Sequence, residues 1–164
     1  MKRPNSSMQL TRGADYAVRV MIQLASPESD GRLSLPGLAA ATDAPESFLS
    51  KVLQSLARAG LITSRRGQAG GFRITPRGRD SSMREVIEAV DGPICLNVCL
   101  AHGPSCTRKA QCPAHPVWAR AQRALFDVLS SVTVATMAAQ AQAPGRANAP
   151  AAIPGLHPHA NPAK

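Results

Sequence analysis

Aromatic residues are scarce in this chain of 164 residues. Phe, Trp and Tyr together make up 3% of it, so a hydrophobic core must be built mainly from Leu, Val, Ile and Ala. No apolar run approaches the roughly 18 residues that a membrane-spanning helix needs. A secretory signal carries an apolar stretch after its first basic residues, and no such stretch follows Lys2 and Arg3. We therefore expect a cytoplasmic protein without membrane contact, long enough for one ordinary domain with its own core.

Acidic residues are also few, since ten Asp and Glu oppose nineteen Lys and Arg and leave a net charge of +9. Residues 1–80 carry twelve Lys or Arg against six Asp or Glu, so most of the excess lies in the first half. Such a charge favours a nucleic-acid partner, because phosphate contacts release counterions; a solvated basic surface is the alternative. No phosphate-binding loop, nucleophile–base pair or paired carboxylates stand out, so an enzyme is not expected.

Hydrophobic periodicity predicts a mostly α-helical fold with one small β-hairpin. Helices are predicted over residues 13–26, 34–41, 45–59 and 82–91 and from Val117 to about Ala139, with the hairpin over 61–74. Gly60 is placed to end the third helix, and Ser82 with Glu85 has the spacing of a capping box. An apolar stripe on the third helix is expected to face the core; its members are Phe48, Leu49, Val52, Leu53 and Leu56.

The order helix, tight turn, helix and basic hairpin over residues 34–74 predicts a winged helix-turn-helix. The second helix of such a unit fits the DNA major groove, and its N-terminal residues face base edges. The residues in that position, which lie off the apolar stripe, are Glu46, Ser47, Ser50 and Lys51. Arg65 and Arg66 stand at a glycine-rich tip narrow enough to enter the minor groove. A plain helical hairpin followed by a solvated turn is the alternative.

The four cysteines lie within eighteen residues, in the pattern C-x₃-C-x₆-C-x₅-C, with His115 three residues later. Tight clustering without a secretory signal indicates metal or redox chemistry in a reducing compartment. Thiolates suit iron–sulfur clusters, zinc and cuprous ions, but structural zinc prefers paired, closely spaced cysteines. The spacing favours a cluster over zinc, and over a thiol switch or inert cysteines, and all of these stay open. Cys95 is the doubtful member, since it could be a ligand or a small buried hydrophobe.

The last predicted helix is too long for the core of so small a domain. Its apolar stripe consists of Val117, Ala121, Leu125, Val128 and Val132. We therefore expect a dimerisation helix, with an ordinary core helix as the alternative. The predicted domains are a winged helix-turn-helix over 8–80, a cluster-binding loop and dimerisation helix over 81–140, and a disordered tail over 141–164.

Four segments and the cysteine loop together resemble the IscR/NsrR-type (Rrf-two) family of bacterial winged-helix regulators over residues 8–138. The segments are MQLTRGADYAVR at 8–19, LITSRRGQAGGFRI at 61–74, VIEAVDGPI at 86–94 and HPVWARAQRAL at 115–125. The resemblance implies a homodimer that binds a double-stranded DNA operator, most simply as a repressor. It also implies that the presence or state of an iron–sulfur cluster sets DNA affinity, so that iron–sulfur status, redox poise or nitric oxide is sensed. An adaptor that binds protein and no DNA is the rival from another class.

On this resemblance the three thiolate ligands are Cys99, Cys106 and Cys112. His115 matches the fourth ligand of the iron–sulfur-biogenesis type and implies [2Fe–2S]. Asp15 matches an aspartate that nitric-oxide sensors supply from the partner subunit, and implies [4Fe–4S]. The resemblance also makes Arg66 the minor-groove arginine and places the reading positions at Ser47, Ser50 and Lys51. Biogenesis regulators carry Glu and Gln where this chain has Ser50 and Lys51, so a different operator is expected.

Overall fold

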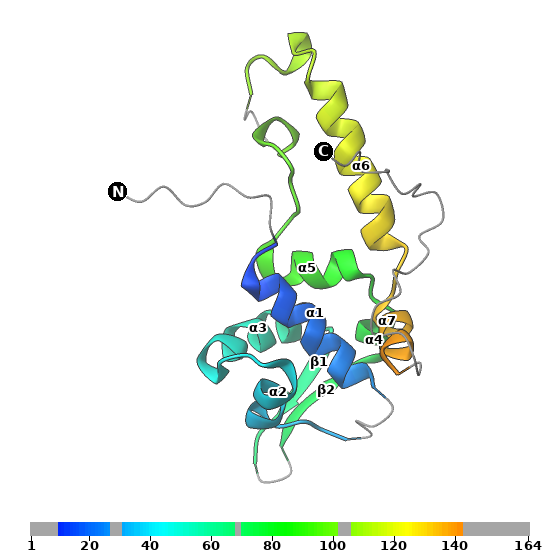
Figure 1. Ribbon diagram of the computed structural model, residues 1–164. Coiled ribbons are helices and arrows are strands. Elements are labelled where there is room, and N and C mark those ends of the chain that lie inside the picture. Colours follow the sequence, from blue (N-terminus) through cyan, green and yellow to red (C-terminus); the bar gives the residue numbers. More distant parts are fainter. Residues whose placement is uncertain (1–9, 27–30, 68–69, 102–105, 143–164) are drawn as a thin grey trace, which may run out of the picture.

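The computed structural model describes residues 10–26, 31–67, 70–101 and 106–142 (Figure 1). These residues form helices and one antiparallel hairpin, whose strands are β1 (Ile62–Arg65) and β2 (Gly71–Ile74). The helices are α1 (Arg12–Ala25), α2 (Leu35–Thr42), α3 (Glu46–Arg58), α4 (Pro76–Asp80), α5 (Met83–Asp91), α6 (His115–Ser130) and α7 (Val134–Ala141). Two short 3₁₀ turns, η1 (Val98–Leu100) and η2 (Lys109–Gln111), lie in the cysteine loop. The mostly helical fold with a small hairpin is therefore confirmed.

Local sequence signals fix several helix ends as predicted. Ser34 caps α2 by accepting from the backbone N–H of Gly37 at 3.2 Å. Gly60 follows α3 with φ of 72°, a left-handed conformation in which glycine avoids the usual steric cost. Ser82 and Glu85 form the predicted capping box at α5. The backbone N–H and hydroxyl of Ser82 donate to the Glu85 carboxylate, and these bonds lower the pKa of Glu85 because they stabilise its charged form.

The hydrophobic core lies between α1 and α3, with α5 and α7 completing it. Its largest fully buried side chains in these four helices are Val20, Met21, Leu49, Leu53, Leu56, Val86, Ile87 and Val134. The predicted inner face of α1, made of Ala17, Val20, Met21 and Leu24, is confirmed by their burial. Because none of the side chains in these two sets is aromatic, the core uses the aliphatic residues that the composition indicated.

The last helix differs from its prediction, because the run from Val117 to Ala139 is two helices. The first ends at Ser130, and Thr133 caps the second by accepting from the N–H of Thr136 at 3.2 Å. Backbone bonds hold the break in place: Met83 N donates to Val132 O, and Val134 N to Ser81 O, each at 2.9 Å. The second helix, α7, therefore turns back onto α1 and α4 instead of extending the first.

Phe48 also departs from its prediction. Its side chain is 41% exposed, whereas the other members of the α3 stripe are buried. It sits at the flank of the helix and meets the ring of Tyr16 edge to face. The short helix α4, which begins at Pro76 after the capping residue Thr75, was not predicted at all. The tail predicted over 141–164 overlaps the end of α7, and from residue 143 it lies outside the described residues.

Helix α6 projects away from the rest of the molecule (Figure 1) and packs against α5 and η1. None of its residues is buried within this chain. In the part of the chain that the structure describes, no helix is long and apolar enough to cross a membrane.

Candidate nucleic-acid interface and cysteine loop

Helices α2 and α3 are joined by a tight turn that sets their relative direction. Asp43 occupies the left-handed region with φ of 51°, which Asp tolerates better than most residues. The buried Thr42 hydroxyl donates to Leu38 O at 2.7 Å, and Ala44 N donates to Ala39 O at 3.1 Å. These bonds satisfy the end of α2 and allow α3 to begin after only three intervening residues.

The N-terminal half of α3 presents the predicted reading residues on its outer side. Glu46, Ser47 and Lys51 are exposed, and Ser50 is half-buried. The opposite side of the helix is consumed by the core. Pro45 precedes the helix and supplies no side-chain cap, so the first-turn N–H groups keep no side-chain acceptor. This face can therefore donate hydrogen bonds both to base edges and to phosphate.

The hairpin is short, and it is anchored at its base. Leu33 and Phe72 exchange backbone hydrogen bonds of 3.0 and 2.8 Å, which attaches a third segment to β2. Gly71 has φ of 129°, and a Cβ there would lie 2.6 Å from Leu33 O, so only glycine allows this close approach. Arg65 and Arg66 lie at the far end of β1 and are exposed.

The cysteine loop carries four free thiols in different environments. Cys95 is exposed, and its Sγ donates to Asn97 O at 2.9 Å. Cys99 lies in η1 and is only 8% exposed. Cys106 and Cys112 are half-buried on either side of η2. Within the described ranges, which omit residues 102–105, no three Cys, His, Asp or Glu side chains come close enough to hold a metal ion.

His115 begins α6 directly after the last cysteine. Its Nδ1 atom is buried and has no hydrogen-bond partner among the described residues. A buried polar atom without a partner costs about 1–3 kcal/mol, so this nitrogen is suited to accept from or coordinate a group beyond the described residues. Asp15 stands in the first turn of α1, where it is half exposed and pairs with Arg19 at 2.8 Å.

Comparison with known proteins identifies the family of this chain. The profile of the Rrf2 family, described as an iron-dependent transcriptional regulator, matches residues 10–140. The chain belongs to the Rrf2 family. It is 30% identical to the regulator NsrR of Geobacillus kaustophilus over 79% of this chain and 89% of that protein. It is also 30% identical to the regulator IscR of Photobacterium profundum, over 77% and 73% of the two chains.

A solved structure agrees with the fold. The global cysteine regulator CymR of B. subtilis superposes with a TM-score of 0.64 at 26% identity, covering 82% of this chain and 98% of that one. This Rrf2 chain therefore has a winged-helix fold and is a helix-turn-helix transcriptional regulator, not an enzyme.

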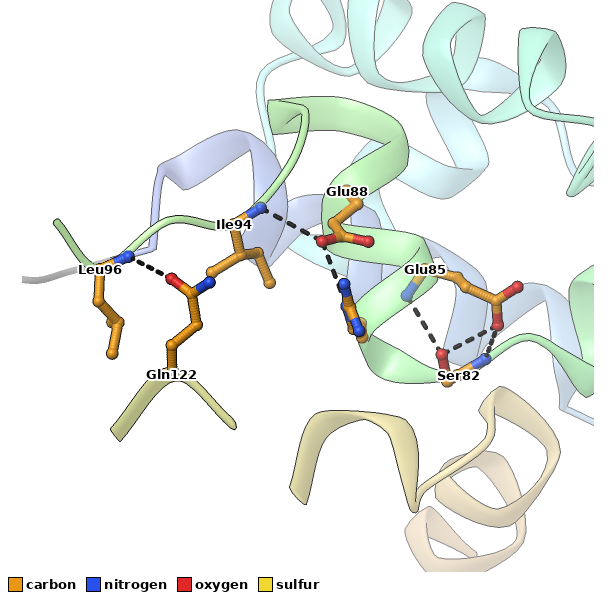
Figure 2. Close-up of polar contacts among 7 residues, drawn as sticks. Ser82, Glu85, Glu88, Ile94, Leu96 and Gln122 are labelled. Carbon is orange, nitrogen blue, oxygen red and sulfur yellow. Dashed lines mark hydrogen bonds and ion pairs between the residues drawn. The ribbon is translucent and has the colours of Figure 1, made fainter. Parts of the chain in front are cut away.

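Residues that the sequence analysis missed hold this Rrf2 protein's loop in place (Figure 2). The Glu88 carboxylate accepts from the N–H of Ile94 at 3.3 Å, and the Gln122 side chain accepts from the N–H of Leu96 at 3.1 Å. The first of these acceptors lies on α5 and the second on α6, so the segment before Cys99 is tied to both helices.

Arg84 links the same two helices. Its guanidinium pairs with Glu88 at 3.2 Å and lies 3.6 Å from the centre of the Phe126 ring on α6. The four-residue spacing of Arg84 and Glu88 is visible in the sequence as a helix pair. Nothing in the sequence indicates that Glu88 would also accept from a loop N–H.

Proposed function

We propose that this Rrf2 regulator binds a double-stranded DNA operator as a homodimer and acts as a repressor in the cytoplasm. Its DNA affinity depends on an iron–sulfur cluster held by Cys99, Cys106 and Cys112, with His115 as fourth ligand. The signal is then the supply of clusters, the redox poise or nitric oxide. The observation that carries the cluster part is the Nδ1 of His115, which is buried beside a cysteine-rich loop and has no hydrogen-bond partner in the part of the chain that the structure describes.

Exposure and charge support DNA binding through α3 and the hairpin. Ser47 and Lys51 are free of the core, and Ser50 is partly so. Arg65 and Arg66 extend the basic surface onto the hairpin. Placing α3 in the major groove leaves the hairpin beside the sugar-phosphate backbone, where an arginine can reach the narrow groove.

The surface of α6 supports dimerisation. The side chain of Val117 is 64% exposed, and Ala121 and Ala124 lie beside it on the same side of the helix. Val98 in η1 and Leu10 before α1 are also large apolar side chains that are at least half exposed. Pairing of two α6 helices about a two-fold axis would cover such a surface. The two reading helices would then lie about one DNA turn apart, on a pseudo-palindromic site.

The donor set of the loop fits an iron–sulfur cluster. Three thiols and one imidazole match the soft and borderline ligands that such clusters accept. When bound, a cluster supplies redox and nitric-oxide reactivity that protein side chains lack. His115 on the same chain completes the shell most directly and favours [2Fe–2S], whereas Asp15 of the partner subunit would favour [4Fe–4S]. The exposed thiol of Cys95 already donates to Asn97 O, so we assign it no ligand role.

Glu88 and Gln122 provide a route from the loop to the DNA-binding helices. These two acceptors already hold residues 94–96, so a movement of the cysteine loop would pull on α5 and α6 through them. Since α5 carries Glu88 and packs against both α1 and α3, a shift of the loop reaches the reading helix through packed side chains.

The deciding experiment is purification without oxygen, followed by a visible absorption spectrum and analysis of iron, sulfide and zinc. We expect a coloured protein containing iron and sulfide. Substitution of Cys99, Cys106 or Cys112 by Ala should remove the colour, and the matched variant Cys95→Ala should keep it.

Other outcomes would contradict the cluster. Zinc without sulfide would mean that the loop binds zinc, and a metal-free protein would mean that the cysteines act as a thiol switch. A colourless Cys95→Ala beside a coloured Cys99→Ala would overturn the ligand assignment.

DNA binding is tested at fixed salt with a selected operator. Arg66→Ala should weaken binding by about 1–3 kcal/mol, the value of one good groove contact. Arg123→Ala removes the same charge from α6 and is the matched control. Equal affinity of the Arg66→Ala variant and the wild type would exclude the minor-groove role.

A further inference from the structure

Phe48 is a large aromatic side chain left 41% exposed on the reading helix. The chain has only three phenylalanines, and this one is placed on α3 between the buried face and the exposed residues Ser47 and Lys51. Its neighbour Leu49 is fully buried, so the core of the helix is complete without it. A half-exposed ring at this position presents an apolar surface toward whatever α3 docks against.

The ring of Phe48 packs on one side against an aromatic ring of α1. It meets the ring of Tyr16 edge to face, with centroids 5.6 Å apart and planes at 71°. The guanidinium of Arg19 lies 6.0 Å from the centre of the Tyr16 ring, pairs with Asp15, and donates to Thr42 O at 3.4 Å. Tyr16 is thus held by its neighbours, and its ring gives one side of Phe48 a packing partner while the rest of the Phe48 side chain stays exposed.

We propose that Phe48 is a specificity-determining residue that contacts the C5 methyl group of a thymine in the major groove. The proposal rests on the proposed docking of α3 in that groove. Thymine is the only standard base with a methyl group at this edge, and apolar side chains recognise it by direct contact. A cytosine at the same place has hydrogen instead of a methyl group at C5, so the apolar contact would be lost.

The test needs an operator, which selection from random duplexes with the full-length protein supplies. Each thymine of the selected site is then replaced, one at a time, by deoxyuridine, which removes only the methyl group. We expect one thymine per half-site at which this change weakens wild-type binding about fourfold, the value of one buried methyl group.

Two variants connect that methyl group to Phe48. In Phe48→Ala the thymine and deoxyuridine duplexes should bind equally, whereas Phe48→Leu keeps an apolar contact and should keep part of the difference. Arg66→Ala serves as control, because it should weaken both duplexes and leave their ratio at the wild-type value. Thermal unfolding of each variant confirms that the comparison is made on folded protein.

The outcomes separate this inference from the DNA-binding proposal. Failure to select any duplex would overturn DNA binding itself. Selection of a site in which every deoxyuridine duplex binds like its parent would overturn the methyl contact alone. A methyl effect that persists unchanged in Phe48→Ala would also overturn it, by assigning the contact to another residue.

Discussion

Two regions of this molecule differ in how they are held together. The winged body, which comprises α1–α5, the hairpin and α7, contains every side chain of the structure that is less than 2% exposed, among the described residues. The arm, residues 93–130, has one buried side chain in its described part, that of Cys99. The body is therefore stabilised by its own packing. The arm is stabilised by a few hydrogen bonds and by any cofactor or second chain that binds to it.

This difference suits a regulator, because binding energy can reorganise only a region of low intrinsic stability. The body keeps the spacing of α3 and the hairpin constant. On the proposed function, a cofactor or a second chain would act on the arm without unfolding the body. The following changes test how sharply the two regions are separated.

The largest effect should come from the centre of the body. Leu53→Ala removes a fully buried side chain and should lower the free energy of unfolding by about 2–5 kcal/mol. Urea denaturation followed by circular dichroism measures it. Leu125→Ala, on the arm, is the matched truncation and should cost much less in the monomeric protein. Equal losses would mean that the two regions unfold as one unit.

The next effect concerns the exposed stripe of α6. Val117→Glu places a charge in the proposed dimer contact and should weaken dimerisation at least about a hundredfold, because an unpaired charge resists burial. Sedimentation at micromolar concentration should then show a monomer with an intact body. Arg123→Glu changes the charge on the same helix away from Val117 and should remain dimeric. A dimeric Val117→Glu would place the interface elsewhere.

A smaller effect is expected at the junction of the two regions. Gln122→Ala deprives the Leu96 N–H of its acceptor and should cost about 1 kcal/mol locally. Hydrogen exchange should show the Leu96 amide opening about fivefold more often, with the amides of α1 unchanged. Gln122→Glu retains an acceptor oxygen and should restore most of the protection. Faster exchange throughout α1 would show that the body depends on the arm.

The smallest effect belongs to the capping box of α5. The lowered pKa of Glu85 means that its carboxylate stabilises the folded state above the ordinary pKa of Glu. This contribution is lost as the pH falls through the lowered value. Since Glu85 is exposed and screened by solvent, we expect only about 0.5 kcal/mol. Melting temperatures of Glu85→Gln and wild type should converge in acid, and a constant difference would contradict the assignment.

Much of the body could be predicted from the sequence, because its signals are local. Ser34, Gly60 and the Ser82–Glu85 pair act within four residues of the helix ends that they fix. The buried faces of α1 and α3 follow from helical periodicity. The burial of Phe48 was predicted wrongly, because helical periodicity gives the direction of a side chain only to within part of a turn. A residue at the edge of the apolar face can therefore be either buried or exposed.

The arm could be predicted less well, because long-range bonds decide its geometry. Val128 and Val132 have the spacing of one continuous apolar stripe, so the helical periodicity of the sequence does not indicate that the helix ends at Ser130. The break is fixed by the backbone bonds of Val132 and Val134 to Met83 and Ser81, about fifty residues earlier. Likewise Gln122 finds its partner 26 residues away. The ligand roles of the cysteines stay predictions, because the spacing of cysteines in a sequence does not determine where a bound cluster would lie.

The bridge between Ser82 and Thr133 joins the two ends of the intervening chain at one point on the body. Lengthening a flexible loop between fixed ends costs little, about 0.6 kcal/mol for each doubling of its length. Residues can therefore be inserted or deleted between the cysteines while α7 stays packed against α1. On the proposed function, the loop that carries the cysteines could therefore change in length while the DNA-binding body keeps its fold.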